Sequence, residues 1–371
     1  MRVMLLSTDR LVFEEGSATR ARMREYGGLF DELAVIVLSQ REEREERLES
    51  ARIAENVTLY PTRSRTKAGM LWDAFSIGSN ILASRNGFTV SAQDPFFTGF
   101  IGYLLARRFR VPLQLQVHTD FLSPYFLRSL RSLVERILAE LLLPRASCVR
   151  VVSERIRNGL LSRAMVAPSR LSVLPIFTRE VSLPSQGRGG GPLRILMASR
   201  LEAEKDIPLA LKAFRDLLRT APGARLSIVG DGRERASLER LTEKLGLSHR
   251  VSFLGWQSGE DLFSSMQEAD IFLSTSRFEG YNRTLIEAAF AGCAILSTDA
   301  GIAGEILTKE EAVIIPVGDR QALLYALERL ASDAPYRLAL GAKARAAALA
   351  RCLTDKQSYL KQWKHALESC Q

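Results

Sequence analysis

Two glutamates, Glu279 and Glu287, are separated by seven residues at the junction of a strand-like run and a helix-like run. Ile271–Ser274 is short and apolar, which predicts a buried strand, and Leu285–Ala289 has helical composition and spacing. A loop that links such a strand to a helix lies at the carboxyl edge of the sheet, where ligands bind in open α/β sheets. Carboxylates there repel phosphate but accept hydrogen bonds from sugar hydroxyls. Alternatively, Glu279 is a solvated loop residue and Glu287 caps or pairs within its own helix.

Two cations, Arg200 and Lys205, follow a second strand-like run, Leu193–Ala198, and precede a helix expected from Ile207. Negative charge develops on a departing phosphate, and a fixed donor group typically lowers such a barrier by about 3 kcal/mol. Cations near a helix N-terminus oppose the helix dipole, which argues against a purely structural role. The pattern therefore predicts a diphosphate site. The alternative is that both residues are surface charges.

Strand-like and helix-like runs alternate along the chain in two series, which predicts an α/β protein with parallel sheets and helices on both faces. The strands expected in the first series are Arg2–Ser7, Leu33–Ser39, Val57–Tyr60, Phe88–Ala92, Leu113–Val117, Cys148–Val152 and Leu171–Pro175. Those expected in the second series are Leu193–Ala198, Arg225–Val229, Val251–Leu254, Ile271–Leu273, Ala294–Ser297 and Val313–Ile315. Expected helices include Thr98–Arg108, Pro124–Leu142 and Asp355–Glu368.

A segment rich in glycine and proline separates the two series, which is typical of an interdomain linker. We therefore expect a first domain over residues 1–180, a linker over 181–192 and a second domain over 193–352. Two parallel-sheet domains joined in this way would leave a cleft between them.

The stretch Glu279-Gly280-Tyr281 with Glu287-Ala288 and Gly292 resembles the nucleotide-sugar site of the retaining family-4 glycosyltransferases (glycosyl transferases group 1). Met197–Asp206 is similar to the family's Ser-Arg…Lys-Gly segment, except that Asp206 stands where the family usually has glycine. The resemblance covers most of the second domain. In the first domain it rests mainly on architecture and on His118, which follows an expected strand.

The resemblance implies the GT-B fold, two Rossmann-like domains with a C-terminal helix, 353–371, that returns to the first domain. It implies that Arg200 and Lys205 hold the donor's phosphates, that Glu287 holds the ribose, and that Glu279 and His118 orient the donor sugar. Those expected in catalysis are His118, Arg200, Lys205 and Glu279. Those expected at the donor are Gly16, Arg200, Lys205, Gly230, Leu254, Gly280, Tyr281, Asn282, Arg283, Thr284, Leu285 and Glu287. Asp94 and Asp120 are expected at the acceptor.

Cysteine and histidine usage indicates neither a metal site nor a disulfide framework, and no Asp-x-Asp occurs, so we expect no metal ion and no cofactor. The first residues form too short an apolar run for a signal peptide, and no run approaches the roughly 18 residues of a membrane span. These features favour a cytoplasmic location.

The net charge of +9 is concentrated between residues 102 and 170, where twelve arginines face four acidic residues. Such a field attracts anions, and no nucleic-acid-binding motif accompanies it. An apolar stripe from Phe126 to Leu141 lies within this segment, flanked by arginines. It would rest on an anionic membrane or pack into the core, and the sequence leaves both open.

Taken with the residues above, the resemblance implies a retaining, metal-independent glycosyltransferase. It would transfer a sugar from a UDP- or GDP-sugar to a saccharide or lipid-linked glycan, in cell-surface polysaccharide or lipopolysaccharide synthesis. The protein would be cytoplasmic, with peripheral attachment to the inner face of the membrane. Two alternatives are a non-catalytic sugar-nucleotide-binding or scaffold subunit, which Asp206 suggests, and a nucleotide-sugar epimerase or phosphorylase of the same fold.

Overall fold

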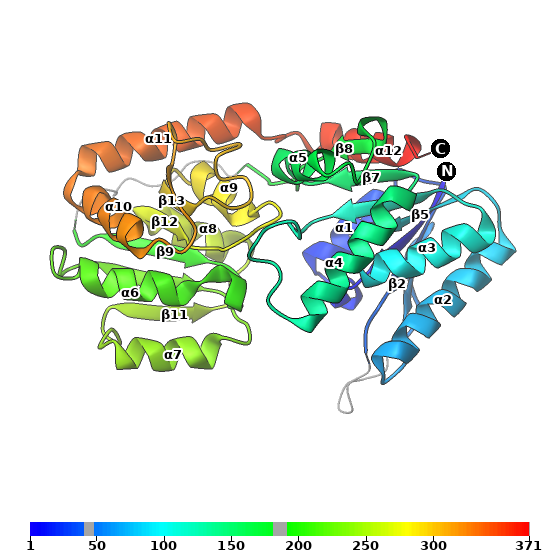
Figure 1. Ribbon diagram of the computed structural model, residues 1–371, viewed down its shortest axis with the longest axis horizontal. Helices are drawn as coiled ribbons and strands as arrows, with labels where there is room; N and C mark the ends of the chain where they lie inside the picture. Colours follow the sequence, from blue (N-terminus) through cyan, green and yellow to red (C-terminus); the bar gives the residue numbers. More distant parts are fainter. Residues whose placement is uncertain (41–47, 181–190, 371) are drawn as a thin grey trace. The chain divides into compact units, whose positions relative to one another are not determined.

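The computed structural model describes residues 1–40, 48–180 and 191–370. The chain forms two compact units, each built on its own sheet (Figure 1). The first comprises Met1–Pro175 and Gln357–Gln371, and the second Ile176–Lys356. Most of the expected linker, residues 181–190, lies outside the described part of the chain. None of the described helices is long and apolar enough to cross a membrane.

The first unit contains an eight-stranded sheet in the order β3-β4-β2-β1-β5-β6-β7-β8. Its strands are β1 (Arg2–Ser7), β2 (Glu32–Val37), β3 (Ala51–Ala54), β4 (Val57–Pro61), β5 (Phe88–Ala92), β6 (Leu113–Val117), β7 (Cys148–Val151) and β8 (Leu171–Val173). Its helices are α1 (Ala18–Gly27), α2 (Lys67–Ser84), α3 (Phe97–Phe109), α4 (Leu130–Leu142), α5 (Glu154–Ser162) and α12 (Lys356–Glu368), with 3-10 turns η1 (Arg10–Phe13), η2 (Leu143–Arg145) and η3 (Pro168–Arg170).

The second unit contains a six-stranded parallel sheet in the order β11-β10-β9-β12-β13-β14. Its strands are β9 (Arg194–Ala198), β10 (Arg225–Val229), β11 (Val251–Gly255), β12 (Ile271–Ser274), β13 (Ala294–Thr298) and β14 (Val313–Ile315). Its helices are α6 (Ile207–Leu217), α7 (Arg235–Lys244), α8 (Gly259–Glu268), α9 (Arg283–Phe290), α10 (Arg320–Ser332) and α11 (Ala334–Arg351), with the 3-10 turn η4 (Ala203–Lys205). The prediction of an α/β protein with two parallel-sheet domains is confirmed.

Two local features differ from the sequence expectations. Strand β3, which was not predicted, pairs antiparallel with β4 at the edge of an otherwise parallel sheet. The helix expected from Pro124 begins only at Leu130, because Ser129 caps it: the Ser129 hydroxyl accepts a hydrogen bond from the backbone N–H of Ser132. A serine that satisfies an otherwise unpaired N–H in this way fixes where a helix starts.

Helix α12 belongs to the first unit although it follows the second in the sequence. Its Trp363 is fully buried and stacks on Tyr26 of α1, with ring centroids 4.2 Å apart. The carbonyl oxygen of Ala366 accepts a hydrogen bond from Gln114 Nε2 on β6 at 2.6 Å. Cys370, just beyond the helix, forms a disulfide with Cys148 of β7 across a sequence separation of 222 residues. The expectation that the cysteines form no disulfide therefore fails for this pair, because the return of α12 brings together two residues that are distant in sequence.

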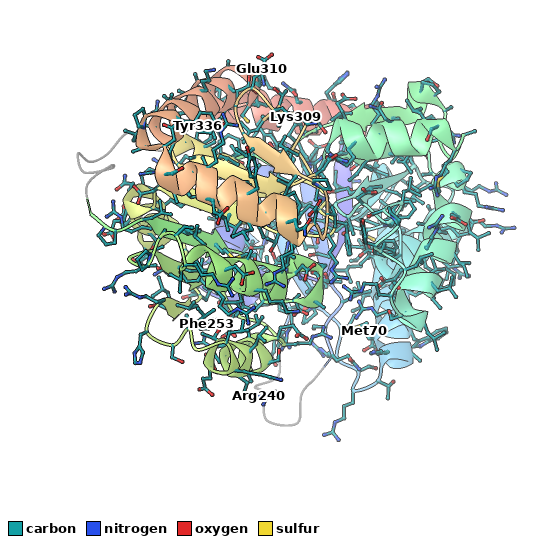
Figure 2. The ribbon with its side chains drawn as sticks, turned by 60° about the vertical axis from the view of Figure 1, so that its left-hand side comes forward. Met70, Arg240, Phe253, Lys309, Glu310 and Tyr336 are labelled. Carbon is teal, nitrogen blue, oxygen red and sulfur yellow. A yellow bond between two sulfur atoms is a disulfide. The ribbon has the colours of Figure 1, made fainter. Side chains whose placement is uncertain are left out.

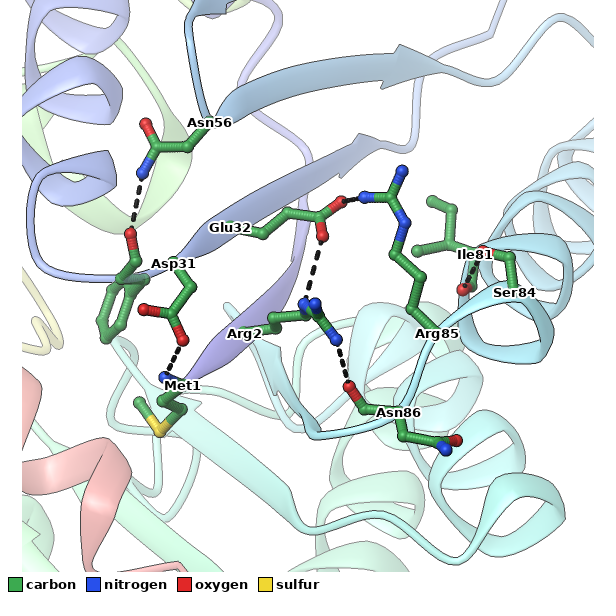
Figure 3. Close-up of polar contacts among 10 residues, drawn as sticks. Met1, Arg2, Asp31, Glu32, Asn56, Ile81, Ser84, Arg85 and Asn86 are labelled. Atoms are coloured by element: carbon green, nitrogen blue, oxygen red, sulfur yellow. Dashed lines mark hydrogen bonds and ion pairs between the residues drawn. The ribbon is translucent and has the colours of Figure 1, made fainter.

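The amino ends of β1 and β2 are held by ion pairs (Figure 3). The N-terminal ammonium of Met1 pairs with Asp31 at 2.5 Å, and Glu32 pairs with both Arg2 and Arg85. These charges lie at the edge of the sheet opposite to the carboxyl ends, where His118 follows β6. In open α/β sheets ligands bind at the carboxyl edge, and these ion pairs lie at the other edge.

Candidate functional site

Lys205 and Glu279 form the centre of the candidate site in the second unit. Lys205 follows β9 and Glu279 follows β12, and these two strands are neighbours in the sheet. From β9 the chain continues to β10 on one side of the pair, and from β12 it continues to β13 on the other side, so the strand order reverses between them. Such a point of reversal is where open α/β sheets bind ligands. Lys205 Nζ lies 2.5 Å from Glu279 Oε1, and Ser276 Oγ donates to the same oxygen at 2.8 Å. The fold therefore brings together one cation and one carboxylate that the sequence analysis assigned to catalysis.

Hydrogen bonds to the backbone join the two loops that carry this pair. Thr275 Oγ1 donates to the carbonyl oxygens of Lys205 at 2.8 Å and Asp206 at 3.1 Å. The N–H of Arg277 donates to the carbonyl oxygen of Glu204 at 2.8 Å. Most side-chain hydrogen bonds in proteins contact the backbone or water, and here they tie one loop to the next. The loops after β9 and β12 thus act as one preorganised element.

Asp206 has a left-handed backbone conformation, with φ 47° and ψ 41°. Glycine adopts this conformation without steric cost, which explains why a glycine suits the position in similar sequences. The Asp206 carboxylate lies 2.9 Å from Arg277 Nε, so its charge is directed to Arg277. Arg277 was not among the residues predicted for the site. The sequence indicated it only as a cation in the loop after β12 that could pair with Asp206, the aspartate at a position where glycine was expected.

The start of α9 carries the other expected donor residues. Asn282 has φ 75°, donates from Nδ2 to Ser274 Oγ at 3.1 Å and precedes Arg283, which pairs with Glu287 at 3.0 Å. Thr284 Oγ1 donates to Asn282 Oδ1. Burial raises the pKa of Glu287, and its Oε2 atom has no hydrogen-bond partner among the described residues. A buried acceptor of this kind is satisfied by a donor such as a hydroxyl.

Arg200 does not join the pair directly. Its side chain is 68% exposed and lies 3.6 Å from Glu204, whereas the Lys205 side chain is only 10% exposed. Its loop is supported by the turn at Gly230, because the N–H of Leu201 donates to the carbonyl oxygen of Asp231. A Cβ on Gly230 would lie 1.8 Å from the carbonyl oxygen of Ser199. Gly230 therefore has a structural reason to be glycine in addition to its expected place at the donor.

The remaining expected donor residues divide between exposed and buried positions. Leu254 on β11, the edge strand, is half-exposed, while Phe253 packs partly against the core, next to the helix that carries Arg240 (Figure 2). Gly280, Tyr281 and Leu285 are buried in the loop and helix after β12. Only the exposed members of this set, such as Leu254, offer side-chain surface to a ligand.

His118 lies at the carboxyl end of β6 in the first unit, and its Nε2 is 2.9 Å from Gln116 Oε1. Arg150 Nη1 also donates to that oxygen at 3.3 Å, so the oxygen is an acceptor and His118 Nε2 must be the donor. Burial, together with the charges of Arg150 and Arg22, lowers the pKa of His118 to about 3. His118 is therefore neutral, with Nδ1 as an acceptor.

The other expected residues of the first unit have local structural roles. Asp94 Oδ1 accepts a hydrogen bond from the N–H of Phe96, and Asp120 Oδ1 accepts one from the N–H of Leu122. Burial raises the pKa of both carboxyls. Gly16 has φ 79° and precedes Ser17, whose hydroxyl caps α1. Acceptor contact by the two aspartates, and donor contact by Gly16, stay predictions.

Curated proteins share sequence with this chain, mainly over part of their length. A lipopolysaccharide core biosynthesis glycosyltransferase of Rhizobium meliloti is 27% identical over 176 residues, 44% of this chain and 51% of that protein. A phosphatidylinositol N-acetylglucosaminyltransferase subunit of Schizosaccharomyces pombe is 32% identical over 158 residues, 42% of this chain and 35% of that protein. The chain thus matches about half or less of the length of these relatives.

The fold is shared with solved structures over the whole chain. HepE of Anabaena, determined in complex with UDP and glucose, superposes with a TM-score of 0.75 at 19% identity and covers 100% of both chains. The sequence model of Glycosyl transferases group 1 matches residues 178–347, and that of Glycosyltransferase Family 4 matches residues 31–177. Together the two models span residues 31–347, and the chain belongs to the family-4 glycosyltransferases of the GT-B fold.

Proposed function

We propose that the protein is a retaining, metal-independent hexosyltransferase. It moves a sugar from a UDP- or GDP-sugar to a saccharide or lipid-linked glycan in cell-surface polysaccharide or lipopolysaccharide synthesis. The observation that carries the proposal is the contact of Lys205 with Glu279 at the reversal point of the second sheet. A cation for phosphate and a carboxylate for sugar hydroxyls, side by side, suit a sugar diphosphate.

In the proposed reaction, the positive charges of the site stabilise the departing diphosphate. The bond between the anomeric carbon and the diphosphate oxygen breaks, and the oxygen keeps the electron pair. Lys205 and Arg200 stabilise the developing charge, and the N–H groups at the start of α9 add the positive end of a helix dipole. The acceptor oxygen bonds to the same carbon from the same face, and its proton passes to the departing phosphate oxygen.

The carboxylates and the histidine bind hydroxyls in this proposal. Glu287 accepts hydrogen bonds from the ribose, which would satisfy its unpartnered Oε2. Glu279 orients the donor sugar next to Lys205. His118 Nδ1, the nitrogen that does not contact Gln116, accepts a hydrogen bond from a sugar hydroxyl. A neutral histidine suits this role because an imidazolium would have no acceptor.

The names of the relatives support the acceptor class. One acts in lipopolysaccharide core synthesis and another on phosphatidylinositol, so lipid-carrying acceptors occur among proteins similar to this chain. The UDP and glucose bound to HepE support a nucleotide-sugar donor. We place acceptor binding on the first unit and the protein at the cytoplasmic face of a membrane.

Calorimetric titration with UDP and with GDP tests the donor site. We expect micromolar binding of one nucleotide, weakened at least tenfold by Lys205→Ala, because a hydrogen bond to a charged group contributes roughly 1.5–3 kcal/mol. Lys244→Ala is the matched control, since Lys244 is an exposed lysine of α7. Absence of binding by either nucleotide to folded protein would contradict the proposal and favour the scaffold alternative.

Turnover experiments test the chemistry. With a sugar nucleotide of the base that binds, transfer should persist in excess EDTA and give a product with the donor's anomeric configuration, read by NMR. Loss of transfer on chelation would refute metal independence, and inversion would refute retention. Conversion of the donor to its epimer without an acceptor would instead favour the epimerase alternative.

A further inference from the structure

Helix α4 of the first unit turns an apolar stripe away from the core. Leu130, Val134, Ile137 and Leu141 are spaced i, i+4, i+7 and i+11, so they line one side of the helix over about 16 Å. Leu130 is 83% exposed, and the other three are between 45% and 51% exposed. Ser132, Ala139 and Leu142, on the opposite side, are the buried ones.

The stripe is part of a larger concentration of apolar surface, which we call the α4 patch. Of the thirteen large hydrophobic side chains that are exposed in the described residues, seven lie between residues 125 and 141. The α4 patch consists of these seven: Tyr125, Leu127, Leu130, Leu133, Val134, Ile137 and Leu141. Single exposed apolar residues are ordinary, but a contiguous patch of this kind marks an interaction surface.

The sequence left open whether this segment packs into the core, and the structure separates its members. Phe126 is buried, with its ring stacked 6.1 Å from that of Phe96, so it belongs to the core. The stripe itself is exposed. Helix α4 packs along α3 (Figure 1). Its buried residues include the small side chains of Ser132 and Ala139.

The charge of the segment that contains α4 indicates the kind of partner. Residues 102–170 contain twelve arginines, no lysine and four acidic residues, a net charge of +8. Arg150 is buried in the core, and Arg131 and Arg136 pair with Glu135 and Glu140 on α4 itself. Arg128 and Arg131 lie at the start of α4, and both are exposed. Two copies of the chain that met through this surface would bring two such positive fields together, which disfavours a dimer. An anionic lipid surface offers negative charge and an apolar interior at once.

We propose that the α4 patch is a membrane-docking surface that places the first unit on an anionic bilayer. The helix would lie in the plane of the interface, with its stripe in the acyl boundary and its arginines at the lipid phosphates. The inference rests on the proposed function only for what the membrane carries, a lipid-linked acceptor. Its physical basis is the surface of the first unit, so binding to lipid is testable without any transfer reaction.

Vesicle co-sedimentation of the full chain tests the docking surface. We expect binding to phosphatidylcholine vesicles that contain about one third phosphatidylglycerol, little binding to pure phosphatidylcholine, and weakening by added salt. Leu130→Gln/Val134→Gln/Ile137→Gln should weaken binding at least tenfold, and Arg128→Gln/Arg131→Gln should weaken it by about tenfold or more. Tyr325→Gln, which removes an exposed aromatic side chain from α10 of the second unit, is the control and should bind as the wild type does.

Circular dichroism and nucleotide titration on the same variants keep the outcomes distinct. A triple variant that is folded and binds nucleotide normally, but no longer binds vesicles, supports the docking surface, whatever the fate of the proposed reaction. Failure of the wild type to bind anionic vesicles overturns the inference, as does equal binding by the triple variant. A concentration-dependent dimer in sedimentation velocity that the triple variant abolishes would assign the α4 patch to a second copy instead.

Discussion

Asp206 and Arg277 lie on separate loops of the second unit, and the carboxylate of one is 2.9 Å from Nε of the other. The pair joins the loop that carries Lys205 to the loop that carries Glu279. The aspartate at this position, where the family resemblance implies glycine, therefore has a partner for its charge. Arg277 thus compensates for the charge of the Asp206 carboxylate.

Asp206→Gly and Asp206→Ala should differ in stability. Glycine removes the penalty of the left-handed backbone, roughly 1–2 kcal/mol, which offsets the loss of a partly exposed ion pair, so we expect a change within about 1 kcal/mol. Alanine loses the ion pair and keeps the penalty, so we expect it to be less stable than the glycine variant by about 1 kcal/mol or more. Urea denaturation measures both. Equal stability of the two variants would show that the backbone at position 206 is not left-handed.

Gly230→Ala should destabilise the protein severely, by about 3 kcal/mol or more, since the new Cβ would collide with the Ser199 carbonyl oxygen. Gly246→Ala is the control: its φ is also positive, at +71°, but nothing lies within 4 Å of a Cβ there. We expect Gly246→Ala to lower the free energy of unfolding by only about 1–2 kcal/mol. Thermal unfolding of the two variants checks the difference, and similar losses would argue against a close approach of the Gly230 turn to the Arg200 loop.

His118 predicts a dependence of stability on pH. Above its ordinary pKa of 6.5, His118 is neutral in the native and unfolded states, so it adds no pH dependence to the free energy of unfolding. As the pH falls below 6.5, the unfolded state binds a proton that the native state does not accept until about pH 3, so stability declines. Between about pH 7.5 and pH 5 the wild type should lose roughly 1–2 kcal/mol more than His118→Gln, which cannot titrate. Denaturant unfolding at both pH values gives the difference, and identical losses would mean that His118 is protonated in the native state.

Trp363→Ala should remove about 3–5 kcal/mol of stability, because the side chain is 1% exposed and stacks on Tyr26. Trp72→Ala, at a tryptophan of α2 that is 70% exposed, should change stability by no more than about 0.5 kcal/mol. Guanidinium unfolding compares the two. If both were equally mild, α12 would not be an integral part of the first unit.

Much of the fold followed from the sequence because apolar periodicity is strong in buried parallel strands. The strand β3 was not predicted because it is a short edge strand, and such strands lack a continuous apolar run. The start of α4 was placed too early, since composition alone does not show which serine caps the helix. The Cys148–Cys370 pair depends on where α12 packs, and local sequence patterns do not encode that.

The candidate site was predicted in its residue types more than in its geometry. Lys205 and Glu279 were selected independently, and the strand order then brought them into contact. The sequence could not show that the Arg200 side chain is exposed, because side-chain orientation depends on the surrounding loop. Arg277 was missed for the same reason, since its partner Asp206 is distant in sequence and near in space.

The return of α12 to the first unit also governs the order of events during synthesis. Ribosomes add roughly 5–20 residues per second, and domains usually fold as they emerge. Here residues 1–175 emerge without the helix that covers Tyr26, and the whole of the second unit, residues 176–356, is made before Trp363 appears. The nascent first unit therefore keeps an apolar site uncovered until α12 has been made.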